Sequence, residues 1–202
     1  MELFQKHIRS LTVRYQRALA LYRKNDRALE ALLVHSGCQL YYFADDRSVC
    51  FQAYGHYLHW LPVNHPDQFI YFSPGQKPIY FQIVPEDYWY DQSIKNASWW
   101  ADSFQIIRLG AVQEIAKYLL DAEVGYIGPN ESRAAEIGID KSAINPDAII
   151  HYLDYQRAYK TPYEINQLKE ANRLAIAGHA AARDRFLNGG NEYQIHMTYM
   201  EA

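Results

Sequence analysis

The N-terminal segment carries apolar side chains at the spacing of an amphipathic helix. Steps of three or four residues connect Phe4, Ile8, Leu11, Tyr15, Ala18 and Tyr22. Positions with this spacing share one face of an α-helix, so the pattern predicts a first helix that ends near Asn25-Asp26. A short apolar run at residues 32–34 follows and stops at Ser36-Gly37. Such a run predicts a buried strand after the helix.

Short runs of aromatic and β-branched residues predict the remaining strands. They cover residues 40–43, 49–51, 57–63, 69–72, 79–83, 104–107 and 124–127. The segment from Ser73 to Pro78 contains two prolines and a glycine, which is typical of the turn between two paired strands. Residues 87–100 are aromatic and polar without a period, so we expect a long loop there.

Helical patterns separate the later strands. The spacing of apolar residues predicts a helix over residues 112–120, and two shorter helices are expected near residues 131–136 and 147–158. Strands that alternate with helices are typical of an α/β fold with helices on both faces of the sheet. We expect this first domain to cover residues 1–158 and a second, incomplete domain to cover residues 159–202.

The second domain begins with strong helix signals. Thr161 suits the N-cap, Pro162 the first helical position and Glu164 the third, which together make a capping box. A narrow face of small and apolar side chains follows at helical spacing. Its members are Ile165, Leu168, Ala171, Ala175, Gly178, Ala182 and Phe186.

A second helix is predicted directly after the first. Asn188-Gly189-Gly190 predicts a left-handed helix end, and Asn191 with Gln194 predicts another capped start. We expect this helix to continue into a longer protein beyond Ala202, because its two or three turns (roughly) fall short of the length at which an isolated helix is stable.

Composition and charge narrow the class of protein. Hydrophobic residues make up 49% of the chain and charged residues 21%, as in a folded domain. The net charge is −3 with both signs interspersed, which argues against a nucleic-acid partner because that requires a clustered basic face. The two cysteines, Cys38 and Cys50, make neither a disulfide framework nor a zinc-finger pattern. No signal peptide or membrane-length apolar run is present in the sequence, so we expect a cytoplasmic protein with no membrane partner.

The chain is rich in tyrosine, with 18 in total. Many fall near the predicted strands: Tyr41, Tyr42, Tyr54, Tyr57, Tyr71, Tyr80, Tyr88 and Tyr90. Tyrosine suits both the half-buried face of a sheet and a hydrated interface between subunits or domains. The sequence leaves both interpretations open.

Few segments carry a recognisable catalytic pattern. His56 and His59 fall on a predicted strand, where residues three apart point to opposite faces, so we do not expect them to share a metal ion. His35 is close in sequence to Cys38, but no base with an orienting partner is evident, and the simpler interpretation is a strand end that enters a turn.

The acidic pair Asp45-Asp46 is the candidate site that remains. It follows the predicted strand at residues 40–43, on a turn where carboxylates can reach a ligand or a partner. The alternative is an ordinary turn, which favours Asp for its hydrogen bonds to the local backbone.

Several segments, taken together, resemble a known family. They are His35-Ser36-Gly37, Trp60-Leu61-Pro62, residues 157–164 (RAYKTPYE), Glu170-Ala171-Asn172-Arg173 and residues 178–184 (GHAAARD). In these segments the chain resembles the bacterial proline dipeptidases, also called Xaa-Pro dipeptidases. They form, with the organophosphorus acid anhydrolases, one branch of the creatinase and methionine-aminopeptidase superfamily.

The resemblance implies a fold and a cofactor. It implies an N-terminal α/β domain with a mixed sheet flanked by helices, followed by the first helices of a larger "pita-bread" catalytic domain. That catalytic domain holds two metal ions, usually manganese, through two Asp, one His and two Glu. All five ligands would lie beyond residue 202, so we expect no catalytic residue, no metal ligand and no peptidase activity in this chain alone.

The resemblance also implies a substrate and a partner. The longer enzyme would hydrolyse dipeptides with a C-terminal proline through a metal-generated hydroxide, and some members hydrolyse organophosphate esters. The N-terminal domain would form a homodimer or higher homo-oligomer. Asp46 matches the position whose carboxylate lines the substrate pocket of the neighbouring subunit. Two alternatives stay open: a non-catalytic peptide- or protein-binding module of the pita-bread family, and the N-terminal part of an aminopeptidase P or creatinase.

Overall fold

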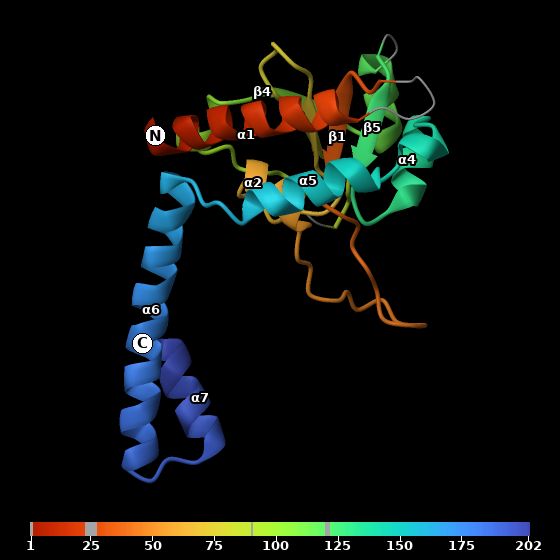
Figure 1. The fold of residues 1–202 in the computed structure, drawn as a ribbon. Coiled ribbons are helices and arrows are strands. Elements are labelled where there is room, and N and C mark those ends of the chain that lie inside the picture. Colours follow the sequence, from red (N-terminus) through yellow and green to blue (C-terminus); the bar gives the residue numbers. More distant parts are fainter. Residues whose placement is uncertain (1, 23–27, 90, 120–121) are drawn as a thin grey trace. The chain divides into compact units, whose positions relative to one another are not determined.

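The computed structural model describes residues 2–22, 28–89, 91–119 and 122–202. The chain divides into two compact units, Met1–Tyr159 and Lys160–Ala202 (Figure 1). The end of the first predicted helix near Asn25-Asp26 lies outside the described residues, as does Leu120 at the end of a later one. Within the described ranges, no helix is both long enough and apolar enough to span a bilayer.

The first unit is built on a mixed sheet. The described strands are β1 (Ala31–His35), β2 (Phe69–Phe72), β3 (Ile79–Ile83), β4 (Gln105–Leu109) and β5 (Val124–Ile127). Their order across the sheet is β4-β3-β2-β1-β5, with β1–β2 and β2–β3 antiparallel and β1–β5 and β3–β4 parallel. The expected α/β class, with a mixed sheet flanked by helices, is confirmed.

Helices α1 (Glu2–Leu21) and α5 (Asp147–Arg157) cover one face of this sheet (Figure 1). The apolar stripe that predicted α1 is its buried face, where Tyr15 packs edge-on against Trp60 and Phe72 at centroid distances of 4.8 and 5.7 Å. The aromatic rings therefore fill the space between helix and sheet with large apolar area.

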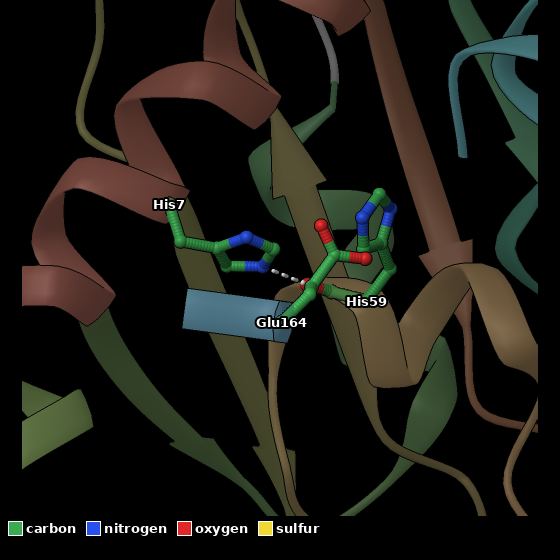
Figure 2. Close-up of side chains that lie close together, drawn as sticks. All are labelled: His7, His59 and Glu164. Carbon is green, nitrogen blue, oxygen red and sulfur yellow. Dashed lines mark hydrogen bonds between the residues drawn. The ribbon is translucent and has the colours of Figure 1, made fainter. Parts of the chain in front are cut away.

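The short helix α2 (Gly55–Trp60) replaces a strand that the sequence pattern predicts at residues 57–63. The strand prediction is wrong because short apolar runs do not distinguish a buried helix turn from a strand. Its buried residues Tyr57 and Trp60 are three apart, as one helical face requires. The Nε2–H of His7 in α1 donates to the carbonyl oxygen of His59 in α2 at 2.8 Å, which fixes the two helices together (Figure 2).

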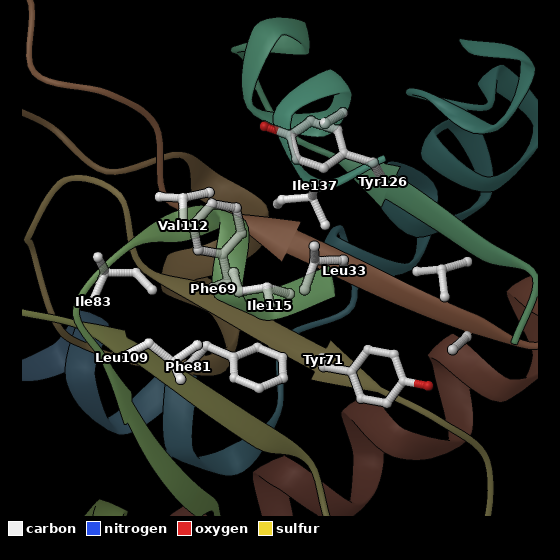
Figure 3. Close-up of a cluster of buried hydrophobic side chains, with 13 residues drawn as sticks. Leu33, Phe69, Tyr71, Phe81, Ile83, Leu109, Val112, Ile115, Tyr126 and Ile137 are labelled. Carbon is white, nitrogen blue, oxygen red and sulfur yellow. The ribbon is translucent and has the colours of Figure 1, made fainter. Parts of the chain in front are cut away.

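The opposite face of the sheet packs under η1 (Val112–Tyr118), a 3-10 helix, and α4 (Glu131–Ile137). Buried side chains from both helices and from all five strands form one cluster (Figure 3). Its members include Leu33, Phe69, Tyr71, Phe81, Ile83, Leu109, Val112, Ile115, Tyr126 and Ile137. Because both faces are covered, β1, β2 and β5 are buried at every position.

The strands predicted at residues 40–43 and 49–51 are absent from the described structure. That segment makes one isolated antiparallel bridge, Tyr41 to Ser48, within a long exposed loop. A two-stranded pairing without a covered apolar face is too weak to form regular strands. The expected loop at residues 87–100 is present in its described part, and its end forms the short helix α3 (Ser98–Ala101).

The second unit consists of α6 (Pro162–Leu187) and α7 (Glu192–Glu201). Both predicted capping boxes are confirmed: Thr161 with Glu164, and Asn191 with Gln194. Gly189 ends α6 with a φ of 82°.

The two helices pack against each other where the predicted small-residue face of α6 contains glycine. A Cβ placed on Gly178 would lie 2.8 Å from the ring of Tyr199 in α7, so only glycine allows this approach. The ring of His179 also contacts Tyr199, at a centroid distance of 5.1 Å.

Candidate functional site

Asp46 lies on the long loop between β1 and α2, which extends away from the sheet (Figure 1). Ala44 takes a left-handed conformation with a φ of 55° and so turns the chain. Asp45 is used locally: its N–H donates to the carbonyl of Tyr42, and its Oδ1 accepts from the N–H of Arg47 at 2.8 Å. Asp46 is exposed, and none of the described residues hydrogen-bonds to its carboxylate. Of the two acidic residues, Asp46 is therefore the one whose carboxylate the described residues leave without a local hydrogen bond.

Large apolar side chains surround this carboxylate in the sequence and are also exposed. Tyr41 is 62% exposed and Phe43 is 101% exposed. Isolated surface aromatics need no explanation, but a run of them on a protruding loop is typical of an interaction surface. We call residues 40–47 the acidic loop.

A cavity of about 450 Å³ lies where the acidic loop joins the sheet. Its lining residues come from both ends of the loop and from the turn after β5: Ser36, Gly37, Cys38, Gln39, Leu40, Val49, Cys50, Phe51, Gln52, Tyr54, Pro129 and Asn130. Asp46 is not among them. The cavity and the predicted site residue are therefore separate features of one loop.

His35, at the end of β1, is completely buried and stacks on Phe69 at a centroid distance of 4.3 Å. Its Nδ1 lies 2.6 Å from the hydroxyl of Tyr126, which itself lies 2.8 Å from the carbonyl oxygen of Asn130. A carbonyl only accepts, so the hydroxyl donates to Asn130 and accepts the Nδ1–H of His35. This places a proton on Nδ1 and leaves Nε2 facing the opposite side.

Asp67 occupies that opposite side. Its Oδ1 lies 3.4 Å from His35 Nε2, accepts from the Cys38 thiol at 3.3 Å and accepts from Arg133 Nε at 2.8 Å. Arg133 Nη2 donates to Oδ2 at 3.0 Å, which completes a bidentate pair. Arg133 also donates to both carboxylate oxygens of Glu136.

These contacts shift several pKa values. Burial raises the pKa of Asp67, but the contact with His35 and the hydrogen bonds from the Arg133 guanidinium outweigh burial and hold this pKa at about 2. Burial lowers the pKa of His35. Burial and the Asp67 carboxylate raise the pKa of the Cys38 thiol to about 11, so Cys38 is protonated at neutral pH and is a poor nucleophile.

We call His35, Cys38, Asp67, Tyr126 and Arg133 the His35 cluster. The sequence pattern indicates only His35 and Cys38 among these residues, and it shows no partner that could orient a base. The structure supplies the missing partners from distant segments: Asp67 from the turn before β2, and Arg133 from α4. The positive φ of Asp67, 53°, is a backbone feature that the sequence does not show.

The pair His56 and His59 does not form a site together, although the reason differs from the strand geometry that we expected. Both residues lie on helix α2. His56 Nε2 contacts Asp154 of α5 at 3.1 Å, whereas the ring of His59 packs edge-on against His7 at 5.3 Å. Burial and the nearby Arg157 lower the pKa of His56. These contacts join α2 to α5 and to α1, and they separate the two imidazoles.

The second unit has no arrangement that fits a dinuclear metal centre. Of its carboxylates, Glu170 pairs with Arg173 at 2.7 Å and Asp184 with Arg183 at 2.7 Å, both on the exposed surface of α6. Within residues 160–202, no three carboxylate or imidazole side chains converge. Residues 160–202 therefore do not by themselves fit the two manganese ions that the resemblance implies.

Comparison with known proteins identifies relatives by sequence and by structure. The family model described as "Xaa-Pro dipeptidase, N-terminal domain" matches residues 2–155. A Xaa-Pro dipeptidase of Erwinia tasmaniensis is 36% identical over 203 aligned positions, which cover 99% of this chain and 45% of that protein. A Xaa-Pro dipeptidase of Escherichia coli is 35% identical with the same coverage. The chain thus spans about half the length of the curated relatives it matches.

Two solved structures of Escherichia coli aminopeptidase P share the fold. A variant of that enzyme matches with a TM-score of 0.66 and 12% identity, over 98% of this chain and 48% of the other. The low-pH form of the enzyme matches with the same TM-score and 13% identity, over 96% and 48%. At this identity the likeness shows the fold alone.

Proposed function

The chain belongs to the Xaa-Pro dipeptidase family through its N-terminal domain, and we propose that it shapes the substrate pocket of an enzyme that hydrolyses dipeptides with a C-terminal proline. The family match over residues 2–155 carries this proposal. The relatives that match are about twice as long, so the catalytic residues of such an enzyme would lie outside residues 1–202.

Asp46 is the residue through which this domain would contact the substrate. Its exposed carboxylate lies on a protruding loop, and none of the described residues uses it. A dipeptide carries a free α-ammonium group, and a carboxylate binds ammonium through a charge-assisted hydrogen bond. The same carboxylate would disfavour blocked peptides, which lack that charge. In the proposed arrangement, Asp46 of one subunit reaches the substrate pocket of its neighbour.

Pairing of subunits would use the apolar part of the same loop. Leu40, Tyr41 and Phe43 expose 61%, 62% and 101% of their surface, and burial of such side chains stabilises an interface. The contact would hold the loop, and with it Asp46, in one position relative to the neighbouring subunit.

Metal-dependent hydrolysis belongs to the proposed longer enzyme and not to this chain. In this proposal the domain contributes substrate binding and subunit pairing. We expect no Xaa-Pro hydrolysis by residues 1–202 with added Mn²⁺, measured by proline release. Measurable release of proline by residues 1–202 would contradict the proposal that the catalytic residues lie outside this chain.

The test of Asp46 uses the full-length enzyme and Asp46→Ala. Loss of a hydrogen bond between charged groups should raise KM for Xaa-Pro dipeptides about 10- to 100-fold, with a much smaller change in kcat. Hydrolysis of N-acetylated substrates, which lack the ammonium, should change little. Asp45→Ala is the matched control, because the Asp45 carboxylate serves the loop backbone. Unchanged kinetics for Asp46→Ala, or equal effects on free and acetylated substrates, would remove Asp46 from the substrate pocket.

A further inference from the structure

The His35 cluster brings three metal-ligand atoms together at a place that the proposed peptidase function does not use. His35 Nε2 lies 3.4 Å from Asp67 Oδ1, and Cys38 Sγ lies 3.3 Å from the same oxygen. All three atoms lie within 4.8 Å of one another. Tetrahedral Zn²⁺ binds N, O and S at about 2.0–2.3 Å, which separates its ligand atoms from one another by about 3.3–3.6 Å. The two measured separations match that geometry.

The histidine is oriented as a metal ligand would be. Its Nε2 is buried and makes no hydrogen bond of normal geometry with any described residue. Its Nδ1–H is held by Tyr126, whose own proton goes to the carbonyl of Asn130. Metal-bound histidines in proteins use the second ring nitrogen in this way, which fixes the tautomer and directs the lone pair of the first nitrogen at the metal.

The local charge also suits a cation. The carboxylates of Asp67 and Glu136 share one guanidinium, that of Arg133, and so retain a net negative charge. A Cys38 thiolate would add a second negative charge. Asp67 Oδ1 has two lone pairs, so it can keep its bond to Arg133 while the lone pair that now accepts the thiol proton binds a metal instead.

From this geometry we propose that His35 Nε2, Cys38 Sγ and Asp67 Oδ1 bind one divalent cation of the zinc class, with water as the fourth ligand. The mixed nitrogen, sulfur and oxygen set selects against Mg²⁺ and Ca²⁺, which prefer oxygen alone. On binding, the Cys38 thiol releases its proton to solvent and the sulfur–metal bond replaces the thiol hydrogen bond to Asp67.

The metal would fix the base of the acidic loop. Cys38 stands where the chain leaves β1 for the loop, and Asp67 stands just before β2, so one ion would join both segments to the buried end of β1. This proposal does not depend on the dipeptidase assignment, and its test requires no substrate.

The test is titration of the metal-free 202-residue chain with Co²⁺ and then with Zn²⁺, under reducing conditions. We expect one Co²⁺ per chain, with the thiolate-to-cobalt charge-transfer band in the near ultraviolet and the visible bands of tetrahedral cobalt. Zn²⁺ should displace the cobalt. Zn²⁺ should also raise the Tm, because a cation that binds only the folded state stabilises it.

Three variants decide between this site and binding elsewhere. Cys38→Ser should abolish the charge-transfer band and the Tm increase while it keeps the circular dichroism of the metal-free chain. Cys50→Ser, which changes the exposed cysteine, should keep both. Tyr126→Phe should weaken binding roughly 10- to 100-fold, as loss of a group that orients a ligand does. Absence of the band in the unaltered chain, its persistence in Cys38→Ser or its loss in Cys50→Ser would overturn the proposal.

Discussion

The His35 cluster, of which His35 and Cys38 directly precede the acidic loop in the sequence, differs from that loop in character. The cluster, from His35 and Cys38 to Arg133, joins four segments of the fold through short polar contacts around one carboxylate, Asp67. The loop, residues 40–47, has one isolated bridge and exposes its aromatic side chains. Two acidic residues, Asp67 and Asp46, thus occupy contrasting environments within one unit.

In this unit one carboxylate, Asp67, stabilises the fold, and another, Asp46, is available for binding. Asp67 is partly buried, and its partners hold it ionised, so its removal should affect folding first. Asp46 contributes no described contact within its own chain, so its removal should affect binding alone. This contrast predicts that stability and binding respond to different substitutions.

The largest expected effect concerns the two cysteines. Because the pKa of the Cys38 thiol is raised to about 11, little of it is thiolate at pH 8, whereas Cys50 is exposed. Only the thiolate reacts, so iodoacetamide should modify Cys38 at least about 10-fold more slowly than the exposed Cys50. Peptide mass spectrometry over a time course of alkylation measures both rates in one sample of metal-free chain. Equal rates would show that Cys38 does not lie in the polar, part-buried environment described.

Asp67→Asn should be the most destabilising of the conservative polar substitutions. It removes the bidentate acceptor of Arg133 and leaves that guanidinium with Glu136 alone. The expected loss is about 2–3 kcal/mol in the free energy of unfolding, measured by urea denaturation at pH 7. Asp46→Asn is the matched control and should lie within about 0.5 kcal/mol of the unaltered chain.

The loss of stability in Asp67→Asn should depend on pH. The pKa of Asp67 is about 2 in the folded state against 3.8 for an unperturbed carboxyl, so its ionisation stabilises the fold above pH 3.8. This stabilisation is lost as the pH falls through that range towards about 2. The difference in unfolding free energy between Asp67→Asn and the unaltered chain should therefore shrink between about pH 4 and pH 2. A difference that stays constant with pH would contradict the pairing of Asp67 with Arg133.

Tyr126→Phe should have a smaller effect. It keeps the buried ring but leaves the His35 Nδ1–H and the carbonyl of Asn130 without their shared hydroxyl. An expected loss of about 1–2 kcal/mol follows from two buried groups that lose one partner. Tyr41→Phe, at an exposed position in the acidic loop, is the control and should not change the urea midpoint. A neutral result for Tyr126→Phe would mean that the hydroxyl does not link these two groups.

The sequence predicts local elements of the fold better than it predicts contacts between distant segments. Local spacing and local side-chain chemistry predict the apolar stripe of α1, the capping boxes of α6 and α7, and the strands β1 to β5. Each of these signals lies within one short segment of the chain. Helix α2 is not predicted in this way, because six residues are too few to separate a helix turn from a strand. Asp46 is a candidate because it lies on a predicted acidic turn and matches a family position, and its role stays a prediction.

The His35 cluster could not be found in this way. Asp67 and Arg133 are 66 positions apart in the chain, and their pairing depends on the path of the chain across the sheet. The left-handed backbone of Asp67, which directs its carboxylate, leaves no pattern in the sequence because Asp and Asn adopt it in many turns. Chemistry assembled from distant segments therefore requires the fold before its residues can be recognised.

The smallest expected change in stability belongs to Phe43→Ser, and it tests the acidic loop most directly. Phe43 is fully exposed, so its removal should change the free energy of unfolding by less than about 0.5 kcal/mol. If the loop pairs subunits, the same substitution should weaken self-association, measured by sedimentation velocity over a concentration series. Phe72→Ala, in the buried sheet face, is the opposite control and should cost about 3–5 kcal/mol. Unchanged association of Phe43→Ser would exclude its side chain from the interface, while a large loss of stability would mean that the loop packs on the fold.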